Sequence, residues 1–270
     1  MKLRFSRFFP LWAWLFAGLL LIAGGVPGSA FAASAATPLT GRTIVVGLDD
    51  NFPPMGFRDE KGNIVGFDID MAREAFKRLG AASVQFKPID WDAKEAELNS
   101  KRVDVLWNGL TITDERKKQI AFTAPYMQNH QIIVVAAKSP IANKAALTGK
   151  VVGAQTGSSA IDAIEKDAAV RKSFRSLKTY GDNVAALMDL NAGRLDAVVL
   201  DEVVGRYYTA KKPGQYRVLQ DNFGTESYGV GLRKSDAALL AELQKALDGM
   251  KRDGASERIS KKWFGANVIQ

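Results

Sequence analysis

Apolar residues along this chain alternate between short strand-like runs and longer runs with helical spacing. One helical stripe is formed by Ile69, Ala72, Phe76 and Leu79, and each pair of neighbouring members is three or four residues apart. We expect Asp68 to be the N-cap of this helix. The strand-like runs occupy 43–47, 84–88, 103–107, 131–136, 151–154, 196–200 and 228–232. Strands alternating with helices in this way predict an α/β protein with mostly parallel sheets flanked by helices.

The pattern restarts in the middle of the chain, which indicates two domains. After the apolar run 131–136, Lys138-Ser-Pro140 interrupts the pattern and a new strand–helix series begins. The strand 228–232 could then carry the chain back to the first domain. We therefore expect one domain from 40–131 and 229–270, and a second from 132–228. With 270 residues and 47% apolar content, the chain can build two cores.

The amino terminus has the composition of a secretory signal peptide. Lys2, Arg4 and Arg7 precede an apolar run of about a dozen residues, and Ala30-Phe-Ala32 follows a Gly/Pro-containing break. We expect cleavage after Ala32, with Ala35 as the alternative, which predicts an exported, periplasmic protein. The chain has no Cys, so we expect no lipid anchor, disulfide or thiol chemistry.

Charge and composition narrow the possible partners. The formal net charge falls from +8 to +5 when the three basic residues of 1–32 leave, and no basic block with interleaved aromatics suggests nucleic acid. His130 is the only histidine, and we expect it to play a hydrogen-bonded structural role. We expect no metal and no cofactor.

The stretch Leu106-Trp-Asn-Gly-Leu-Thr-Ile-Thr-Asp-Glu-Arg116 combines small hydrogen-bonding residues with one fixed cation. Backbone carbonyls and hydroxyls suit an ammonium group, and the planar Arg116 fork suits a carboxylate. The stretch therefore fits a small zwitterion and contains no nucleophile. It also fits a capped helix start with a solvated charged face.

Three other segments follow strands and could reach a ligand. Asp49, Asp50, Phe52 and Phe57 lie in a proline-containing loop after the first strand, where ligands bind in open α/β sheets. Gly157-Ser-Ser159 opens a helix and could hold an anion, and Asp201 follows an apolar strand and could meet an ammonium. The alternatives are aromatics that fill the core and ordinary N-caps at the Ser and Asp positions.

Five motifs occur in a characteristic order along the chain: Gly66-Phe-Asp-Ile-Asp70, Thr111-Ile-Thr-Asp-Glu-Arg116, Ala121-Phe-Thr-Ala-Pro-Tyr126, Ala192-Gly-Arg-Leu-Asp196 and Lys262-Trp-Phe-Gly265. With these motifs in order, the chain resembles the amino-acid branch, family 3, of the bacterial extracellular solute-binding proteins that serve ABC importers. The resemblance runs from about Gly41 to Gly265. It implies a two-lobe periplasmic-binding-protein fold with two hinge strands, which closes around its ligand.

The resemblance also implies a role for each site residue. Arg116 and the backbone amides of Thr111 and Ser158 would bind the ligand α-carboxylate. The α-ammonium would be held by Asp201, by the Gly109 carbonyl and by the Thr111 hydroxyl. In the side-chain pocket Phe52 would pack on the ligand side chain, and Asp49 would bind the polar end of that side chain.

The sequence departs from the histidine- and lysine/arginine/ornithine-binding pattern in that pocket. Phe52 replaces a Tyr, and Asn108-Gly109 replaces a Ser pair. The buried carboxylate of Asp49 favours a donor or cation, and Asn108 can both donate and accept. We therefore expect the ligand to be a free polar amino acid, basic ones included, although these residues do not single out one amino acid. We expect the protein to be a monomer that delivers this ligand to a membrane permease.

Two other functions fit the same fold. Prephenate or arogenate dehydratases resemble this family, and Glu202 is the acid that could act as general acid in such an enzyme. A ligand sensor is the second alternative. The retained pair of Arg116 and Asp201 favours amino-acid capture without catalysis.

Overall fold

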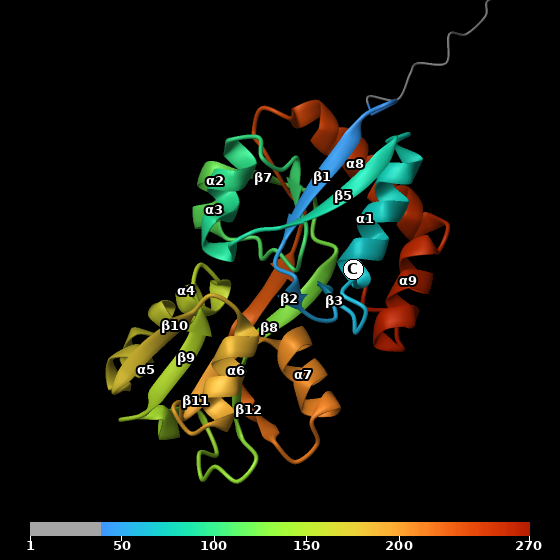
Figure 1. The fold of residues 1–270 in the computed structure, drawn as a ribbon. Helices are drawn as coiled ribbons and strands as arrows, with labels where there is room; N and C mark the ends of the chain where they lie inside the picture. The colour runs from blue at the N-terminus through green and yellow to red at the C-terminus, as the bar shows by residue number, and fades with distance from the viewer. Residues whose placement is uncertain (1–38) are drawn as a thin grey trace, which may run out of the picture. The chain divides into compact units, whose positions relative to one another are not determined.

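The computed structural model describes residues 39–270, so the predicted signal peptide at 1–32 lies outside the described residues. Two five-stranded sheets and one small three-stranded sheet organise this part of the chain (Figure 1). Helices pack against both large sheets, as the alternating sequence pattern predicts. The α/β fold class is confirmed.

The first large sheet carries the site stretch after its central strand. Its spatial order is β5 (Ser83–Pro88), β1 (Thr43–Leu48), β6 (Val105–Leu106), β13 (Gly231–Leu232) and β7 (Ala121–Phe122). β5, β1 and β6 are parallel, whereas β13 runs antiparallel to both β6 and β7. The parallel part is the part that sequence alternation predicts.

The second large sheet has the same mixed character. Its order is β10 (Ser176–Tyr180), β9 (Val151–Gln155), β11 (Ala197–Asp201), β8 (Met127–Ala136) and β12 (Tyr216–Tyr228). β10, β9 and β11 are parallel, and β8 is antiparallel to β11 and to β12. The carboxyl ends of β9 and β11 therefore meet at one edge, where Ser158 and Asp201 lie.

The chain passes between the sheets along β8 and back after β12. β7 belongs to the first sheet, β8 to the second, and β13 to the first again. The described residues, 39–270, belong to one compact unit by their contacts. The division at 131/132 and 228/229 stays a prediction.

The helices follow the expected amphipathic faces. Leu239, Leu243, Ala246 and Met250 form the buried stripe of α8 (Ala237–Arg252), which contacts α1 (Phe67–Arg78) and α9 (Ala255–Phe264). The remaining helices are η1 (Trp91–Ala93), α2 (Lys94–Asn99), α3 (Asp114–Gln119), η2 (Lys144–Leu147), α4 (Ser159–Lys166), α5 (Ala168–Ser173), α6 (Asn183–Asn191) and α7 (Glu202–Lys211). Among residues 39–270, none of the helices is long and apolar enough to cross a membrane.

Two local expectations are wrong. The proline-containing segment after β1 is not an open loop, because it forms β2 (Asn51–Phe52) and β3 (Gly56–Arg58), which pair with each other. β3 also pairs with β4 (Ile64–Val65). Asp68, which looks like an N-cap, lies inside α1, and Gly66 occupies the cap position. Asp68 is fully buried, and its carboxylate is bonded to the site stretch instead.

Candidate functional site

The turn after β6 is held in place from two sides. Asp68 Oδ2 accepts hydrogen bonds from Gly109 N at 2.7 Å and from Tyr126 Oη at 2.9 Å. Burial raises the pKa of Asp68 to about 7, and these hydrogen bonds oppose the shift. Thr113 caps α3 by accepting from Arg116 N at 3.1 Å. The capped helix start and the buried cation therefore coexist in one stretch.

Arg116 is buried, with 6% of its surface exposed, and its donors face backbone carbonyls. Nη1 donates to Thr111 O at 2.8 Å, and Nη2 donates to Gly157 O at 3.0 Å on the second-sheet side. Nε lies 3.6 Å from Glu95 Oε1. Burial lowers the pKa of Arg116, while the charges of Glu95 and Glu226 raise it. Arg116 thus joins the turn to the second sheet and keeps a buried positive charge there.

Lys94 is a second buried cation that the sequence analysis missed. Its Nζ donates to Trp91 O at 3.0 Å and to Gly157 O at 2.8 Å. Burial and the neighbouring charge of Arg116 lower the pKa of Lys94 to about 8. The Gly157 carbonyl thus accepts from both cations, which fixes the loop before α4 against the first-sheet side.

Asp201 ends β11 and is buried, as the strand pattern predicts. It stands at the N-cap position of α7 but makes no side-chain cap bond. Its Oδ1 instead accepts from Asn129 Nδ2 and from Tyr228 Oη, each at 2.7 Å. The N-cap alternative therefore does not explain this residue, whose carboxylate faces the strands β8 and β12.

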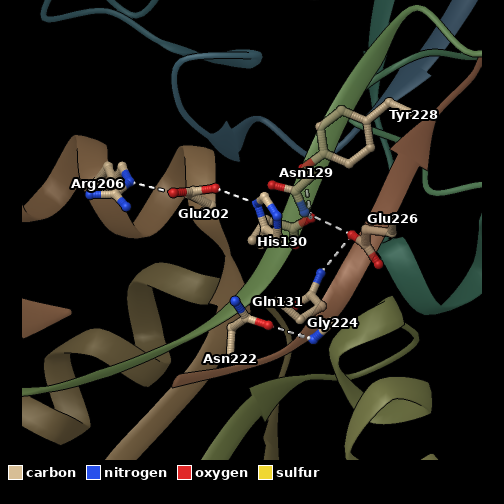
Figure 2. A network of polar contacts seen from close by, with 10 residues as sticks. Asn129, His130, Gln131, Glu202, Arg206, Asn222, Gly224, Glu226 and Tyr228 are labelled. Carbon is tan, nitrogen blue, oxygen red and sulfur yellow. Dashed lines mark hydrogen bonds and ion pairs between the residues drawn. The ribbon is translucent and has the colours of Figure 1, made fainter. Parts of the chain in front are cut away.

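Glu226 of β12 belongs to the site, although the sequence did not predict it. Its Oε1 accepts from Thr111 Oγ1 at 2.7 Å and from Ser159 Oγ at 3.2 Å, so it contacts residues from both sides. Asn129 Nδ2 and Gln131 Nε2 also donate to it, each at 2.8 Å (Figure 2). The family resemblance implied that the Thr111 hydroxyl would bind the ligand ammonium. The structure shows it bonded to Glu226.

The helix α4 contributes Ser159 to these contacts, whereas Ser158 points elsewhere. Ser159 Oγ lies 3.0 Å from Thr111 Oγ1. Ser158 Oγ and Ser158 N both donate to Gln155 O, at 2.7 and 3.3 Å. Ser158 is the N-cap residue of α4 by position and makes no side-chain cap bond. The proposed role of the Ser158 amide as an anion donor stays a prediction.

The expected side-chain pocket is brought together at the other end of the turn. Asn108 Nδ2 donates to Asp49 O at 2.7 Å, and Gln155 Nε2 donates to Asp49 Oδ2 at 2.7 Å. Burial raises the pKa of Asp49 to about 6, against the hydrogen bonds from Asn51 and Gln155. Phe52 is buried beside Gly109. Gln155 is a further member that the sequence analysis did not single out.

Gly109 allows this close packing. Its φ is +58°, and a Cβ at this position would lie 2.8 Å from the Phe52 ring and 3.2 Å from the Tyr228 ring. Only glycine combines this backbone conformation with that approach. Glycine at position 109 therefore has a steric reason in this chain.

Two cavities lie near different parts of this region. One of about 250 Å³ is lined by Thr111, Gln131, Ser159 and Glu226 among others. A larger one of about 540 Å³ is apolar and lies by Tyr207, Trp263 and Phe264. Glu202 and Asn129 line the larger cavity, but none of the residues expected to bind the amino acid does, whereas Thr111 lines the smaller one. We therefore place the site at the polar cluster.

Known proteins share the fold and the sequence pattern. Residues 44–266 match the family model of bacterial extracellular solute-binding proteins, family 3. The L-cystine-binding protein TcyJ of Escherichia coli (strain K12) is 32% identical over 230 residues, which cover 84% of this chain and 85% of that protein. The lysine/arginine/ornithine-binding periplasmic protein of the same strain is 33% identical over 238 residues, covering 84% and 89%.

A solved structure agrees in fold. The substrate-binding protein of an ABC uptake transporter from Streptococcus pneumoniae, with bound histidine, has a TM-score of 0.81 and 37% identity. The match covers 84% of this chain and 94% of that one. Matches of this extent identify the family. This chain belongs to the bacterial extracellular solute-binding proteins of family 3.

Proposed function

We propose that this chain captures a free polar L-amino acid, basic ones included, between its two sheets and delivers it to a membrane ABC permease. The observation that carries the proposal is a pair of buried, opposite charges around Thr111. Buried Arg116 contributes the positive pole, and buried Asp201 with the half-buried Glu226 contributes the negative pole. A zwitterion presents the complementary charges to both poles.

The binding step would use contacts that already link the two sides. Gly157 O receives the donors of Arg116 and Lys94, and Asp49 receives Gln155 from the second sheet. In this mechanism the α-carboxylate meets Arg116 first, and closure then brings the second-sheet residues Ser158 and Asp201 to the ligand. The closed form is the one that a permease would recognise.

The side-chain pocket supports a polar ligand. Asp49, Asn108 and Gln155 supply carboxylate and amide groups, and Asn108 Oδ1 is a buried acceptor that no described residue satisfies. A guanidinium, ammonium or amide group could donate to it. The names of the relatives include cystine-, histidine- and lysine/arginine/ornithine-binding proteins, which agrees with this range.

A catalytic role receives less support. Glu202, the acid weighed for a dehydratase, is bonded to His130 at 2.7 Å and forms an ion pair with Arg206 (Figure 2). Its two carboxylate oxygens are thus bonded to His130 of β8 and to Arg206 of α7. We propose a binding protein without a chemical step, exported to the periplasm by its first 32 residues.

A thermal-shift screen tests the proposal. The mature protein is unfolded, freed of carried-over ligand and refolded, and is then heated with each amino acid, cystine, ornithine or prephenate. A ligand at a hundred times its dissociation constant adds about 2.7 kcal/mol to the free energy of unfolding. For a chain of this size that is several degrees.

Two outcomes of the screen are informative. Shifts confined to a few polar or basic amino acids support capture and identify the side chain that the Asp49 pocket reads. A shift with none of them contradicts the proposal. Conversion of prephenate to phenylpyruvate would favour the dehydratase instead.

A further inference from the structure

The polar cluster beside Thr111 contains more hydrogen-bond acceptors than donors. Asn129 Nδ2 donates both to Asp201 Oδ1 at 2.7 Å and to Glu226 Oε1 at 2.8 Å. Two carboxylates thus share the donors of one amide nitrogen. Burial raises the pKa of Asp201, and the negative charge of Glu226 raises it further. An added cation would relieve this repulsion.

The amide oxygens of the same cluster lack donors. Asn129 Oδ1 and Gln131 Oε1 are buried, and no group among residues 39–270 donates to either. The two residues are 2% and 1% exposed. Turning either amide around would place its oxygen against a carboxylate, so their nitrogens must face Glu226. Unsatisfied buried acceptors of this kind cost free energy unless a ligand satisfies them.

Strand geometry aims all of these groups to one side. Asn129 and Gln131 are two residues apart on β8 and share a face, whereas His130 points to Glu202 (Figure 2). Glu226 is the register partner of Asn129 on β12. The nearby cation Arg116 gives two of its donors to Thr111 O and Gly157 O. A cation from outside the chain would therefore complete the hydrogen bonds and balance the negative charge of this cluster.

We propose that Glu226 is the second carboxylate of an ammonium subsite and that it holds, together with Asp201, the α-ammonium of the bound amino acid. An ammonium group has three donors, which match two carboxylates and an amide oxygen. Thr111 and Ser159 then orient Glu226 through their hydroxyls. This inference rests on the proposed function and adds a binding residue to it.

The test compares amino acids with analogues that lack the amino group. L-arginine, L-histidine, L-glutamine and L-cystine are titrated calorimetrically into the parent protein. Their counterparts are 5-guanidinopentanoate, 3-(imidazol-4-yl)propanoate, 4-carbamoylbutanoate and 3,3′-dithiodipropionate, measured by competition. In the parent, we expect strong preference for the amino acid that binds. Glu226→Gln should reduce that preference at least tenfold, because it removes one negative charge facing the ammonium.

The other outcomes overturn the inference. Equal weakening of the amino acid and its analogue in Glu226→Gln would mean that Glu226 only supports the structure. Unchanged preference would mean that the ammonium lies elsewhere. If Glu226→Gln does not fold, Glu226→Asp decides: it keeps the charge but withdraws it by one methylene, so the preference should fall several-fold, and an unchanged preference contradicts the inference.

A matched control and the parent itself separate the possible failures. Glu202→Gln removes a carboxylate from the neighbouring residue of Asp201, but that carboxylate bonds His130 and Arg206. It should leave the preference unchanged, and an equal loss there would contradict a specific role for Glu226. If the parent binds none of the four amino acids, the proposed function fails. If it binds one with a preference independent of Glu226, only this inference fails.

Discussion

At the scale of single residues, Arg116 combines two tasks that substitution can separate. It fastens the turn through the carbonyls of Thr111 and Gly157, and it supplies the buried positive charge. Lysine would keep the charge but lose the planar fork of donors, and alanine would lose both. The two variants therefore distinguish charge from geometry.

We expect Arg116→Ala to weaken amino-acid binding by two to three orders of magnitude or more. Removing one partner of a buried charge pair costs about 3–5 kcal/mol, and this cost appears in the dissociation constant. Arg116→Lys should fall between the parent and Arg116→Ala. Calorimetric titration measures both, with Arg206→Ala as a control at an exposed ion pair. Parent-like binding by Arg116→Ala would remove Arg116 from the site.

Gly109 is the second position where a single atom matters. Its positive φ and the nearby Phe52 and Tyr228 rings leave no room for a Cβ. Gly109→Ala should lower the free energy of unfolding by about 1–3 kcal/mol more than a glycine substitution that brings backbone strain alone. Gly62→Ala is that comparison, because Gly62 has a φ of +81° and nothing within 4 Å of its added Cβ. Urea unfolding of both variants gives the difference, and equal losses would contradict the steric argument.

At the scale of elements, local patterns predicted many of the strands and helix faces, but they predicted neither β10 and β12 nor the contacts between distant strands. The strand that ends at Asp201 and the apolar stripe of α8 follow from residues near one another in sequence. Glu226 could not be predicted in this way. β12 has two register irregularities between Val218 and Thr225, and they determine that Glu226 faces Asn129.

The same limit explains the other missed residues. Lys94 looks like an ordinary surface lysine at a helix start, and only the approach of Gly157 makes it buried. Asp68 looks like a cap, although Gly109 and Tyr126 bond its carboxylate from 41 and 58 residues away. Each residue type was visible in the sequence. The partner that gives it a role was not, because tertiary packing selects it.

The loop between β9 and α4 allows a test of how the two sheets approach one another. Gly157 has a φ of +69°, and a Cβ there would lie 2.8 Å from Asp92 Cα across the interface. Gly157→Ala should therefore weaken binding at least tenfold, because opening the interface relieves the contact without unfolding the chain. Gly149→Ala is the control for backbone strain, with a φ of +73° and no neighbour within 4 Å.

Two measurements distinguish Gly157→Ala from its control Gly149→Ala. Urea unfolding should show similar losses of stability, since both variants place alanine in the left-handed region. Calorimetric titration should show weakened binding only for Gly157→Ala. Equal affinities for the two variants would mean that the contact between Gly157 and Asp92 is not required for the bound form.

At the scale of the whole molecule, three buried carboxyls link stability to pH. Burial raises the pKa of Asp49 to about 6 and that of Asp68 to about 7, and burial with Glu226 raises that of Asp201. Between about pH 4 and pH 7 the folded chain therefore binds more protons at these groups than the unfolded chain. Their contribution to the free energy of unfolding falls as the pH rises through that window.

Ligand affinity should depend on pH in the opposite direction from the free energy of unfolding. The α-ammonium of a bound amino acid favours the charged form of Asp201, so binding must displace any proton held there. The affinity should consequently rise between pH 5 and pH 7, by up to about tenfold per pH unit for one linked proton. Titrations at pH 5, 6, 7 and 8 measure this change in affinity.

Two variants test the assignment to Asp201. Asp201→Asn should bind more weakly and lose most of the dependence of affinity on pH. Asp68→Asn, which alters a carboxyl bonded to Gly109 and Tyr126, should keep that dependence. An affinity that stays constant or falls as the pH rises would show that the ammonium does not meet Asp201, and the negative pole of the site would then have to be assigned to other residues.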